Sequence, residues 1–217
     1  MANDPAAPNR AVVFIDGNNW YHALKLAGVT GQMHLSYPKI AKKLVGPREW
    51  RELRYYVGQV QQTGNTDLYA SQRQFFAKLT GADDRVTLHT GRLETRPVKN
   101  KCAEEILEYL GGLQTRIDRT VHHRLLEIAK QHRRGTVMVE KAVDVMIAVD
   151  MVVMAERDKY DTAYLLSADG DFTPVAKAVR AHGKKIFAVC PSRGAQLAAA
   201  VDAFIPIDAA WFIDCFD

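Results

Sequence analysis

The chain has few cysteines and no long hydrophobic run. Its three cysteines, Cys102, Cys190 and Cys215, are odd in number and far apart, so they predict neither a disulfide framework nor a zinc site. No apolar stretch approaches the roughly 18 residues that a membrane-spanning helix needs. The first ten residues lack the basic and apolar segments of a secretory signal. These absences favour a cytoplasmic protein without a membrane segment, and they leave residues 1–10 as a disordered leader.

Length and composition indicate an ordinary folded domain. The chain has 217 residues, of which 47% are hydrophobic and 25% charged, and we expect a single domain over residues 11–217. The net charge is +4, and residues 96–134 carry nine basic against five acidic side chains, which accounts for the whole excess. A basic surface of this kind attracts phosphate, although a solvated helix face has the same composition.

Strand-like and helix-like segments alternate along most of the chain. Strands separated by helices pair in parallel through right-handed crossovers, so the pattern predicts an α/β sandwich with a central, mainly parallel sheet. We expect strands at 11–15, 53–60, 85–93, 163–167, 185–189 and 204–207, and helices at 20–27, 38–45, 67–79, 143–155, 174–182 and 195–201.

Residues 99–134 interrupt this alternation with two helical stretches and no strand. We read the segment as a helical insertion that forms either an RNA-binding lid or a homodimer surface. Its apolar residues recur at near-helical spacing and are expected to pack inward: Leu113, Ile117, Val121, Leu125 and Ile128. Its basic candidates for RNA binding then face elsewhere: Arg116, Arg119, His123 and Lys130.

Aspartates follow two of the predicted strands. Asp16 ends the first, Asp169 and Asp171 follow the strand at 163–167, and Asp144 opens the apolar helix at 143–155. The carboxyl ends of parallel strands lie at one edge of a sheet, where ligands bind at the point at which strand order reverses. Carboxylate oxygens are the ligands that Mg²⁺ and Mn²⁺ prefer. The pattern therefore indicates a metal-dependent hydrolase.

Three of the four aspartates also have a simpler interpretation. Asp16 is a suitable N-cap for the following helix, Asp171 a turn residue, and Asp144 a first-turn acid favoured by the helix dipole. Their joint occurrence favours a shared site. Asp150 lies on another face of the helix, so we expect it to pair with a basic residue.

Three motifs carry a resemblance to a known family. They are FIDGNN at residues 14–19, KAVDV at 141–145 and SADGDF at 167–172. In this order they resemble the NYN domain, a branch of the PIN-like nucleases, and within it the LabA-like bacterial group. The resemblance implies a three-layer α/β/α fold of PIN-like type and metal-dependent cleavage of RNA, with single-stranded RNA as the partner.

The resemblance also assigns roles to individual residues. It implies a catalytic group of six residues, of which the four aspartates hold Mg²⁺ or Mn²⁺: Asp16, Asn19, Asp144, Ser167, Asp169 and Asp171. Asn19 orients a water or a carboxylate, and Ser167 contacts a carboxylate or a phosphate. Apart from the resemblance, Lys141, one turn before Asp144, and Arg193, in the loop after the strand at 185–189, are candidates for phosphate contacts, although a solvated lysine is the simpler interpretation of Lys141.

Two other functions compete with the nuclease. A non-catalytic, RNA-binding regulatory protein can keep the same fold and the same acids. A phosphohydrolase that forms an aspartyl-phosphate requires a second acid two residues after the first, and position 18 is asparagine. A dinucleotide site is disfavoured because no G-x-G-x-x-G follows the first strand.

Overall fold

The computed structural model describes residues 9–60, 66–113 and 116–217. By its contacts the chain separates into two compact units, unit 1 (Met1–Arg92 and Glu140–Asp217) and unit 2 (Leu93–Val139). Most of the expected leader, residues 1–8, lies outside the described residues. Within the described ranges no helix is both long and apolar enough to cross a membrane.

A seven-stranded sheet has the strand order β4-β3-β2-β1-β5-β6-β7, and it is mixed and mostly parallel, as predicted. The central strand β1 pairs with β2 on one side and with β5 on the other. The order of strands therefore reverses at β1. The strands are β1 (Arg10–Asp16), β2 (Glu49–Gln59), β3 (Val86–Lys99), β4 (Arg134–Lys141), β5 (Thr162–Leu166), β6 (Lys185–Cys190) and β7 (Ala203–Pro206).

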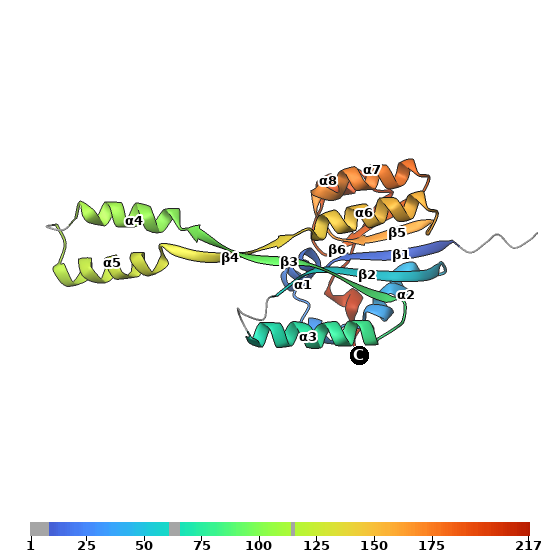
Figure 1. Ribbon diagram of the computed structural model, residues 1–217, viewed down its shortest axis with the longest axis horizontal. Helices are drawn as coiled ribbons and strands as arrows, with labels where there is room; N and C mark the ends of the chain where they lie inside the picture. The colour runs from blue at the N-terminus through green and yellow to red at the C-terminus, as the bar shows by residue number, and fades with distance from the viewer. Residues whose placement is uncertain (1–8, 61–65, 114–115) are drawn as a thin grey trace, which may run out of the picture. The chain divides into compact units, whose positions relative to one another are not determined.

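Helices cover both faces of the sheet in unit 1, which confirms the expected three layers (Figure 1). One face is covered by α1 (Gly17–Leu26), α2 (Tyr37–Val45) and α3 (Thr66–Gly81), with the short 3₁₀ turns η1 (Gln32–His34) and η3 (Ala209–Phe212) on the same side. The other face is covered by α6 (Val143–Glu156), α7 (Thr173–Ala181) and α8 (Ala195–Ala198). The 3₁₀ turn η2 (Gly170–Phe172) directly precedes α7.

Alternating residues of β1 build the two halves of the core. Val13 and Ile15 pack with α1 and α2, whereas Val12 and Phe14 pack with α6 and α7. Because successive side chains of a strand point to opposite faces, a strand covered on both sides must be apolar throughout. The apolar run before Asp16 therefore places this aspartate at the end of a strand that is buried on both faces.

Unit 2 contains α4 (Lys101–Gly111) and α5 (Arg119–His132), which contact each other. The N-cap side chains Asn100 and Asp118 accept hydrogen bonds from backbone N–H groups in the first turn of α4 and α5 respectively. The buried residues of the two helices are Ala103, Leu110, His122 and Ala129.

The prediction that the apolar residues of α5 pack inward was wrong for three of them. Val121, Leu125 and Ile128 are exposed, and the residues directly after two of them, His122 and Ala129, are buried instead. A helix with a single neighbour buries only a narrow stripe, and here that stripe is shifted by one residue from the one expected. Leu113 and Ile117 precede α5 and are half-buried.

The strand β4 was not expected, and β3 continues to Lys99, beyond the predicted end at residue 93. The sequence of β4, RGTVMVEK, has charged residues at both ends and a glycine in second place. It lacks a clear alternation of polar and apolar residues. Missing this strand has a consequence for the site, because its next-to-last residue is an acid that the sequence analysis did not identify as a candidate.

The residue between β4 and α6 has an unfavourable backbone conformation. Ala142 is the N-cap of α6 and has φ 73°, in the left-handed region. A side chain in this region costs about 1 kcal/mol that glycine does not pay. We expect Ala142→Gly to raise the free energy of unfolding by about 0.5–1 kcal/mol, measured by urea denaturation. As the matched control, Ala148→Gly inside α6 should lower it by a similar amount; a loss of stability in both variants contradicts the argument.

Candidate active site

The carboxyl ends of β1 and β5 meet at one point. Asp16 is the last residue of β1 and is 4% exposed, and Ser167 follows β5 directly and is fully buried. The Ser167 hydroxyl donates a hydrogen bond to Asp16 Oδ2 at 3.1 Å. Both residues were predicted from the sequence, and the structure brings them together where strand order reverses, as expected for a ligand site of an α/β sheet.

Asn19 ties the helix after β1 to the loop after β5. Its backbone N–H donates to Asp16 Oδ1 at 3.2 Å, so Asp16 caps α1, and its side-chain Oδ1 accepts from the Ala168 N–H at 3.1 Å. The capping interpretation of Asp16 is therefore correct as well. Asp16 has one oxygen held by a backbone amide and the other by a hydroxyl, which fixes the orientation of its carboxylate.

Asp169 and Asp171 follow in the same loop. The Asp169 N–H donates to Ser167 Oγ at 3.1 Å, and Asp169 Oδ1 accepts from the Asp171 N–H at 2.9 Å. Asp169 thus caps η2 and is half-buried, whereas Asp171 is exposed. The chain of hydrogen bonds from Asp16 through Ser167 to Asp169 links two segments that are 151 residues apart in the sequence.

Asp144 belongs to the same electrostatic group. Partial burial raises its pKa, and repulsion from Asp169 and Asp171 raises it further. Burial raises the pKa of Asp16 to about 6, and repulsion from Asp144 and Asp169 adds to this increase, whereas the Asn19 and Ser167 hydrogen bonds oppose it. Burial and repulsion both disfavour the charged form of these carboxylates, and a nearby cation would favour it.

Glu140 is the acid that the sequence analysis missed. It lies near the end of β4, is half-buried, and its Oε1 atom is buried without a hydrogen-bond partner. Burial raises the pKa of Glu140 to about 7, with further repulsion from Asp16 and Asp144 and an opposing hydrogen bond from the Gly58 backbone. In the sequence, Glu140 could have been found by its position four residues before Asp144. Because β4 was not predicted, Glu140 was not recognised as an acid near the end of a strand.

These residues suit a divalent cation in their chemistry but do not form a finished coordination sphere. Among the described residues, no three His, Cys, Asp or Glu side chains lie close enough together to hold a metal ion. The donor set consists of hard carboxylate oxygens, one of them buried and unpartnered in Glu140. A cation with its own bound waters can bridge carboxylates that are too far apart to share it directly, as Mg²⁺ commonly does.

Two glycines let neighbouring segments approach the acids. A Cβ on Gly17, directly after Asp16, would lie 2.6 Å from the backbone oxygen of Tyr56. A Cβ on Gly91 in β3 would lie 2.5 Å from the backbone oxygen of Lys141. Both contacts are with backbone, which moves less easily than a side chain, so these positions require glycine for close approach.

The basic candidates separate into two groups. Lys141 and Arg193 are in unit 1, Lys141 at the end of β4 and Arg193 in the loop after β6. The other four, Arg116, Arg119, His123 and Lys130, are exposed and belong to unit 2, so they are not part of the compact unit that holds the acids. Lys130 forms an ion pair with Glu127 at 3.7 Å.

Asp150 has the structural role expected of it. Its Oδ2 atom lies 3.1 Å from Arg54 Nη2 and accepts a hydrogen bond from the Tyr56 hydroxyl at 2.8 Å. The pair fastens α6 to β2, and Asp150 is not one of the groups that raise the pKa values of Asp16, Glu140 or Asp144.

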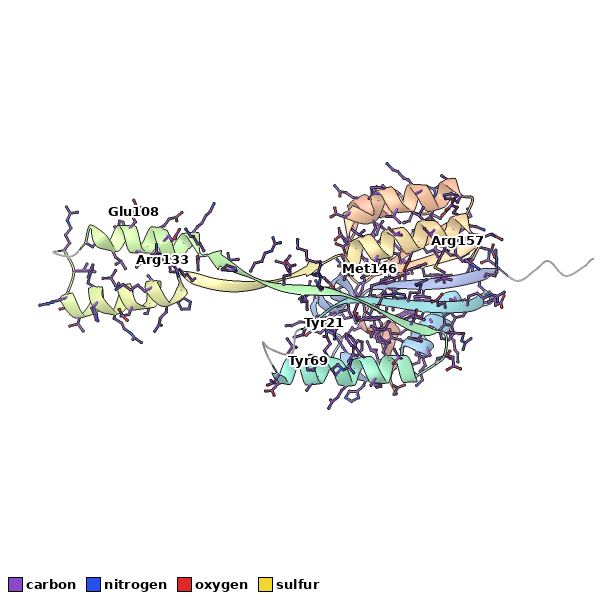
Figure 2. The ribbon with its side chains drawn as sticks, in the orientation of Figure 1. Tyr21, Tyr69, Glu108, Arg133, Met146 and Arg157 are labelled. Atoms are coloured by element: carbon purple, nitrogen blue, oxygen red, sulfur yellow. The ribbon has the colours of Figure 1, made fainter. Side chains whose placement is uncertain are left out.

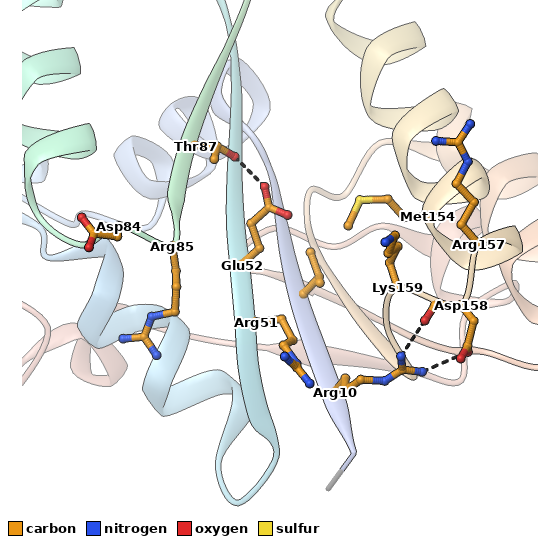
Figure 3. Close-up of a pocket in the computed structure, with 11 residues that line it drawn as sticks. Arg10, Arg51, Glu52, Asp84, Arg85, Thr87, Met154, Arg157, Asp158 and Lys159 are labelled. Atoms are coloured by element: carbon orange, nitrogen blue, oxygen red, sulfur yellow. Dashed lines mark hydrogen bonds and ion pairs between the residues drawn. The ribbon is translucent and has the colours of Figure 1, made fainter. Parts of the chain in front are cut away.

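A cleft of about 550 Å³ lies at the opposite end of β1 from Asp16, where β1 begins and α6 ends (Figure 3). Arg10 at this edge pairs with Asp158 and with Asp161, and the Thr87 hydroxyl donates to Glu52 at 3.0 Å. Within the cleft the charges of Arg10 and Asp158 neutralise each other, and none of the candidate catalytic residues lines it.

Comparison with known proteins agrees with this fold. A solved structure of a protein of unknown function from Vibrio parahaemolyticus superposes with a TM-score of 0.58 at 17% identity, covering 94% of this chain and 96% of that one. This likeness shows the fold. A second structure, from work on the mechanism and regulation of Sir2 enzymes, covers 94% of this chain and 89% of that one at 12% identity, but its TM-score of 0.38 carries no argument.

Family membership is established by the sequence as a whole. No curated protein matches the chain at a significant level. The family model of the NYN domain matches residues 10–208, a range that includes the sheet, both glycine contacts and every acid described above. The chain belongs to the NYN domain family.

Proposed function

We propose that the protein is a metal-dependent ribonuclease that hydrolyses RNA phosphodiester bonds at the carboxyl edge of its sheet. NYN domains are PIN-like, and PIN-like domains are generally nucleases. The observation that carries the proposal is the convergence of Asp16, Glu140, Asp144 and Asp169. Burial raises the pKa values of Asp16, Glu140 and Asp144, and mutual repulsion adds to the increase. Carboxylates assembled against this repulsion at a ligand-binding edge support a role in binding a cation.

Asp16, Asp144, Asp169 and Asp171 would hold Mg²⁺ or Mn²⁺, and we add Glu140 to this set. When bound, the metal supplies charge stabilisation for the phosphate and activates water. Asp16 is held in one orientation by Asn19 and Ser167, so it presents the same face to a ligand throughout the reaction. The side-chain oxygen of Asn19 is bonded to the Ala168 amide, so its role is to fix the loop that carries Asp169. Lys141 and Arg193 would bind phosphate beside the acids.

Single-stranded RNA is the proposed partner, since the family and the excess of positive charge both suit a phosphate backbone. The exposed side chains of Arg116, Arg119, His123 and Lys130 would add sequence-independent contacts with the backbone. Membership of the LabA-like branch and a cytoplasmic location stay predictions from the sequence.

A non-catalytic, RNA-binding protein is the second candidate. One observation favours it: within the described part of the chain, no three potential ligands are close enough to hold a metal as they stand. Such a protein binds RNA in the presence of several divalent metals without cutting it, which the same assay detects.

The test is cleavage of labelled single-stranded RNA with Mg²⁺, with Mn²⁺ or with EDTA. We expect cleavage with metal only, and a loss of about a hundredfold in Asp144→Asn, because one ligand charge worth about 3 kcal/mol is removed. Asp144 is exposed, so the variant should fold normally. The matched control is Glu156→Gln, an exposed acid at the other end of α6, which should cut at the wild-type rate. If the wild type binds RNA without cutting it, the protein is the non-catalytic RNA-binding protein. If Asp144→Asn keeps full activity, Asp144 is not part of the catalytic site.

A further inference from the structure

The two helices of unit 2 run antiparallel. At one end His122 Nε2, near the start of α5, lies 2.7 Å from the backbone oxygen of Leu110, near the end of α4. At the other end Arg133, just after α5, forms an ion pair with Glu104 at 3.5 Å. The interface between the helices is small, because only Ala103, Leu110, His122 and Ala129 are buried.

Apolar residues lie beside this interface on both helices. On α4 they are Cys102, Ile106 and Tyr109, and on α5 they are Val121, Leu125 and Ile128. Four of them directly precede a buried residue of the interface, and the other two lie one helical turn from one of these four. The exposed apolar stripe of each helix is therefore rotated by about 100° from the side that faces the other helix. Because the helices are antiparallel, equal rotations in the same sense bring both stripes to the same side of the pair. We call these six residues the apolar face.

The apolar face is open in the described structure. Tyr109 is 72% exposed, Val121 52% and Ile106 49%, and Leu125 and Ile128 are each 41% exposed. The side chains that stand out from both helices are seen in Figure 2. Helices of this length are marginal in water unless tertiary contacts cover their apolar sides. A partner that covers this face would therefore stabilise unit 2.

The charges of the two helices are complementary. In α4 three glutamates stand against one lysine, a net charge of −2, whereas in α5 two arginines and one lysine stand against one glutamate, a net charge of +2. A second copy turned by a two-fold axis can place its α4 over the α5 of the first, and its α5 over the first α4. The same surface on both copies then gains favourable charge pairing twice.

We propose that the apolar face binds the same face of a second copy of this chain, so that two α4–α5 pairs form a four-helix bundle. Short antiparallel helix pairs commonly reach a closed core in this arrangement. The exposed side chains would bury on the order of 500 Å² per copy, or about 1,000 Å² in total, which is the lower limit for a stable specific interface. The proposal concerns association and is independent of whether the acids cut RNA.

Analytical ultracentrifugation of the full chain over a range of concentrations tests this. We expect the wild type to shift from a monomer of 24.3 kDa to a species of twice that mass as concentration rises. Leu125→Glu puts a carboxylate at the centre of the face and should leave only monomer. The matched control is Thr120→Glu, which adds the same carboxylate to an exposed position of α5 outside the face and should still form dimers. Circular dichroism checks that both variants are equally helical.

A second measurement uses the one exposed cysteine. Cys102 is exposed and lies on the apolar face, whereas Cys190 and Cys215 are buried. Its reaction with a thiol reagent should slow by several-fold as the wild type dimerises, and it should not change with concentration in Leu125→Glu. Wild type that stays monomeric at all concentrations overturns the proposal, and so does a Leu125→Glu variant that dimerises like the wild type.

Discussion

Replacing Asp16 by asparagine is expected to lower the rate of metal-dependent RNA cleavage by about a thousandfold and to leave the protein folded. Asp16 is the most buried acid of the site, so its charge is screened least by water. Losing about 4 kcal/mol of stabilisation in the transition state corresponds to this factor. Asparagine keeps an oxygen that can accept the Asn19 N–H, and it is as good an N-cap as aspartate, so α1 should start at the same residue.

The measurement is kcat/KM on labelled RNA at saturating Mn²⁺, together with thermal unfolding in EDTA. Asp208→Asn is the matched control, since Asp208 caps η3 through the Trp211 N–H at 3.0 Å and takes no part in the acid group. The control should cleave as the wild type does. If Asp16→Asn cleaves RNA at the wild-type rate, the proposed site is wrong, because this change removes the most buried charge of the acid group.

Without metal, the acid group should make the protein less stable as pH rises from about 4 to 7. Burial raises the pKa of Asp16 to about 6 and that of Glu140 to about 7, above their values in the unfolded chain. In this window the folded state therefore binds more protons than the unfolded state, and the free energy of unfolding falls with increasing pH. Two pKa units on Asp16 amount to about 3 kcal/mol, and the more open Glu140 adds less because water screens it.

The difference between the wild type and Asp16→Asn isolates this effect. His89, whose pKa is lowered mainly by burial, changes stability in the opposite direction, but it does so equally in both proteins. Urea denaturation in EDTA at several pH values should show the wild type losing about 3 kcal/mol relative to Asp16→Asn between pH 4 and pH 7. Added Mn²⁺ should restore the wild type and not the variant. A difference that is independent of pH means that Asp16 ionises in the folded state as easily as in the unfolded chain.

The sequence was sufficient to predict the layers of unit 1 and the residues that meet at the carboxyl ends of β1 and β5. Apolar runs that end in aspartate define β1 and the loop after β5, because a fully buried strand must be apolar and its polar neighbours must lie at its ends. The hydrogen bond between Ser167 and Asp16 follows from the register of these two strands, in which Ile15 pairs with Leu166.

Two features could not be predicted from the sequence: the part that Glu140 takes in the acid group, and the exposure of the apolar face. The acid at residue 140 depends on β4, whose short sequence has weak strand character, and on a long-range approach to β2 and β3. The direction of the α5 stripe depends on which side of α5 meets α4. Helical spacing defines a stripe but not its partner, and a shift of one residue turned three expected core residues into surface.

The cleft near Arg10 and the acids near Asp16 occupy opposite ends of β1, roughly 20 Å apart for a strand of this length. For inhibitor discovery this separation matters. A compound that binds in the cleft would lie among arginines at the amino end of the strand and would contact none of the candidate catalytic residues. If the proposed function is correct, a useful inhibitor would instead carry a chelating group that competes for the carboxylates at the carboxyl end.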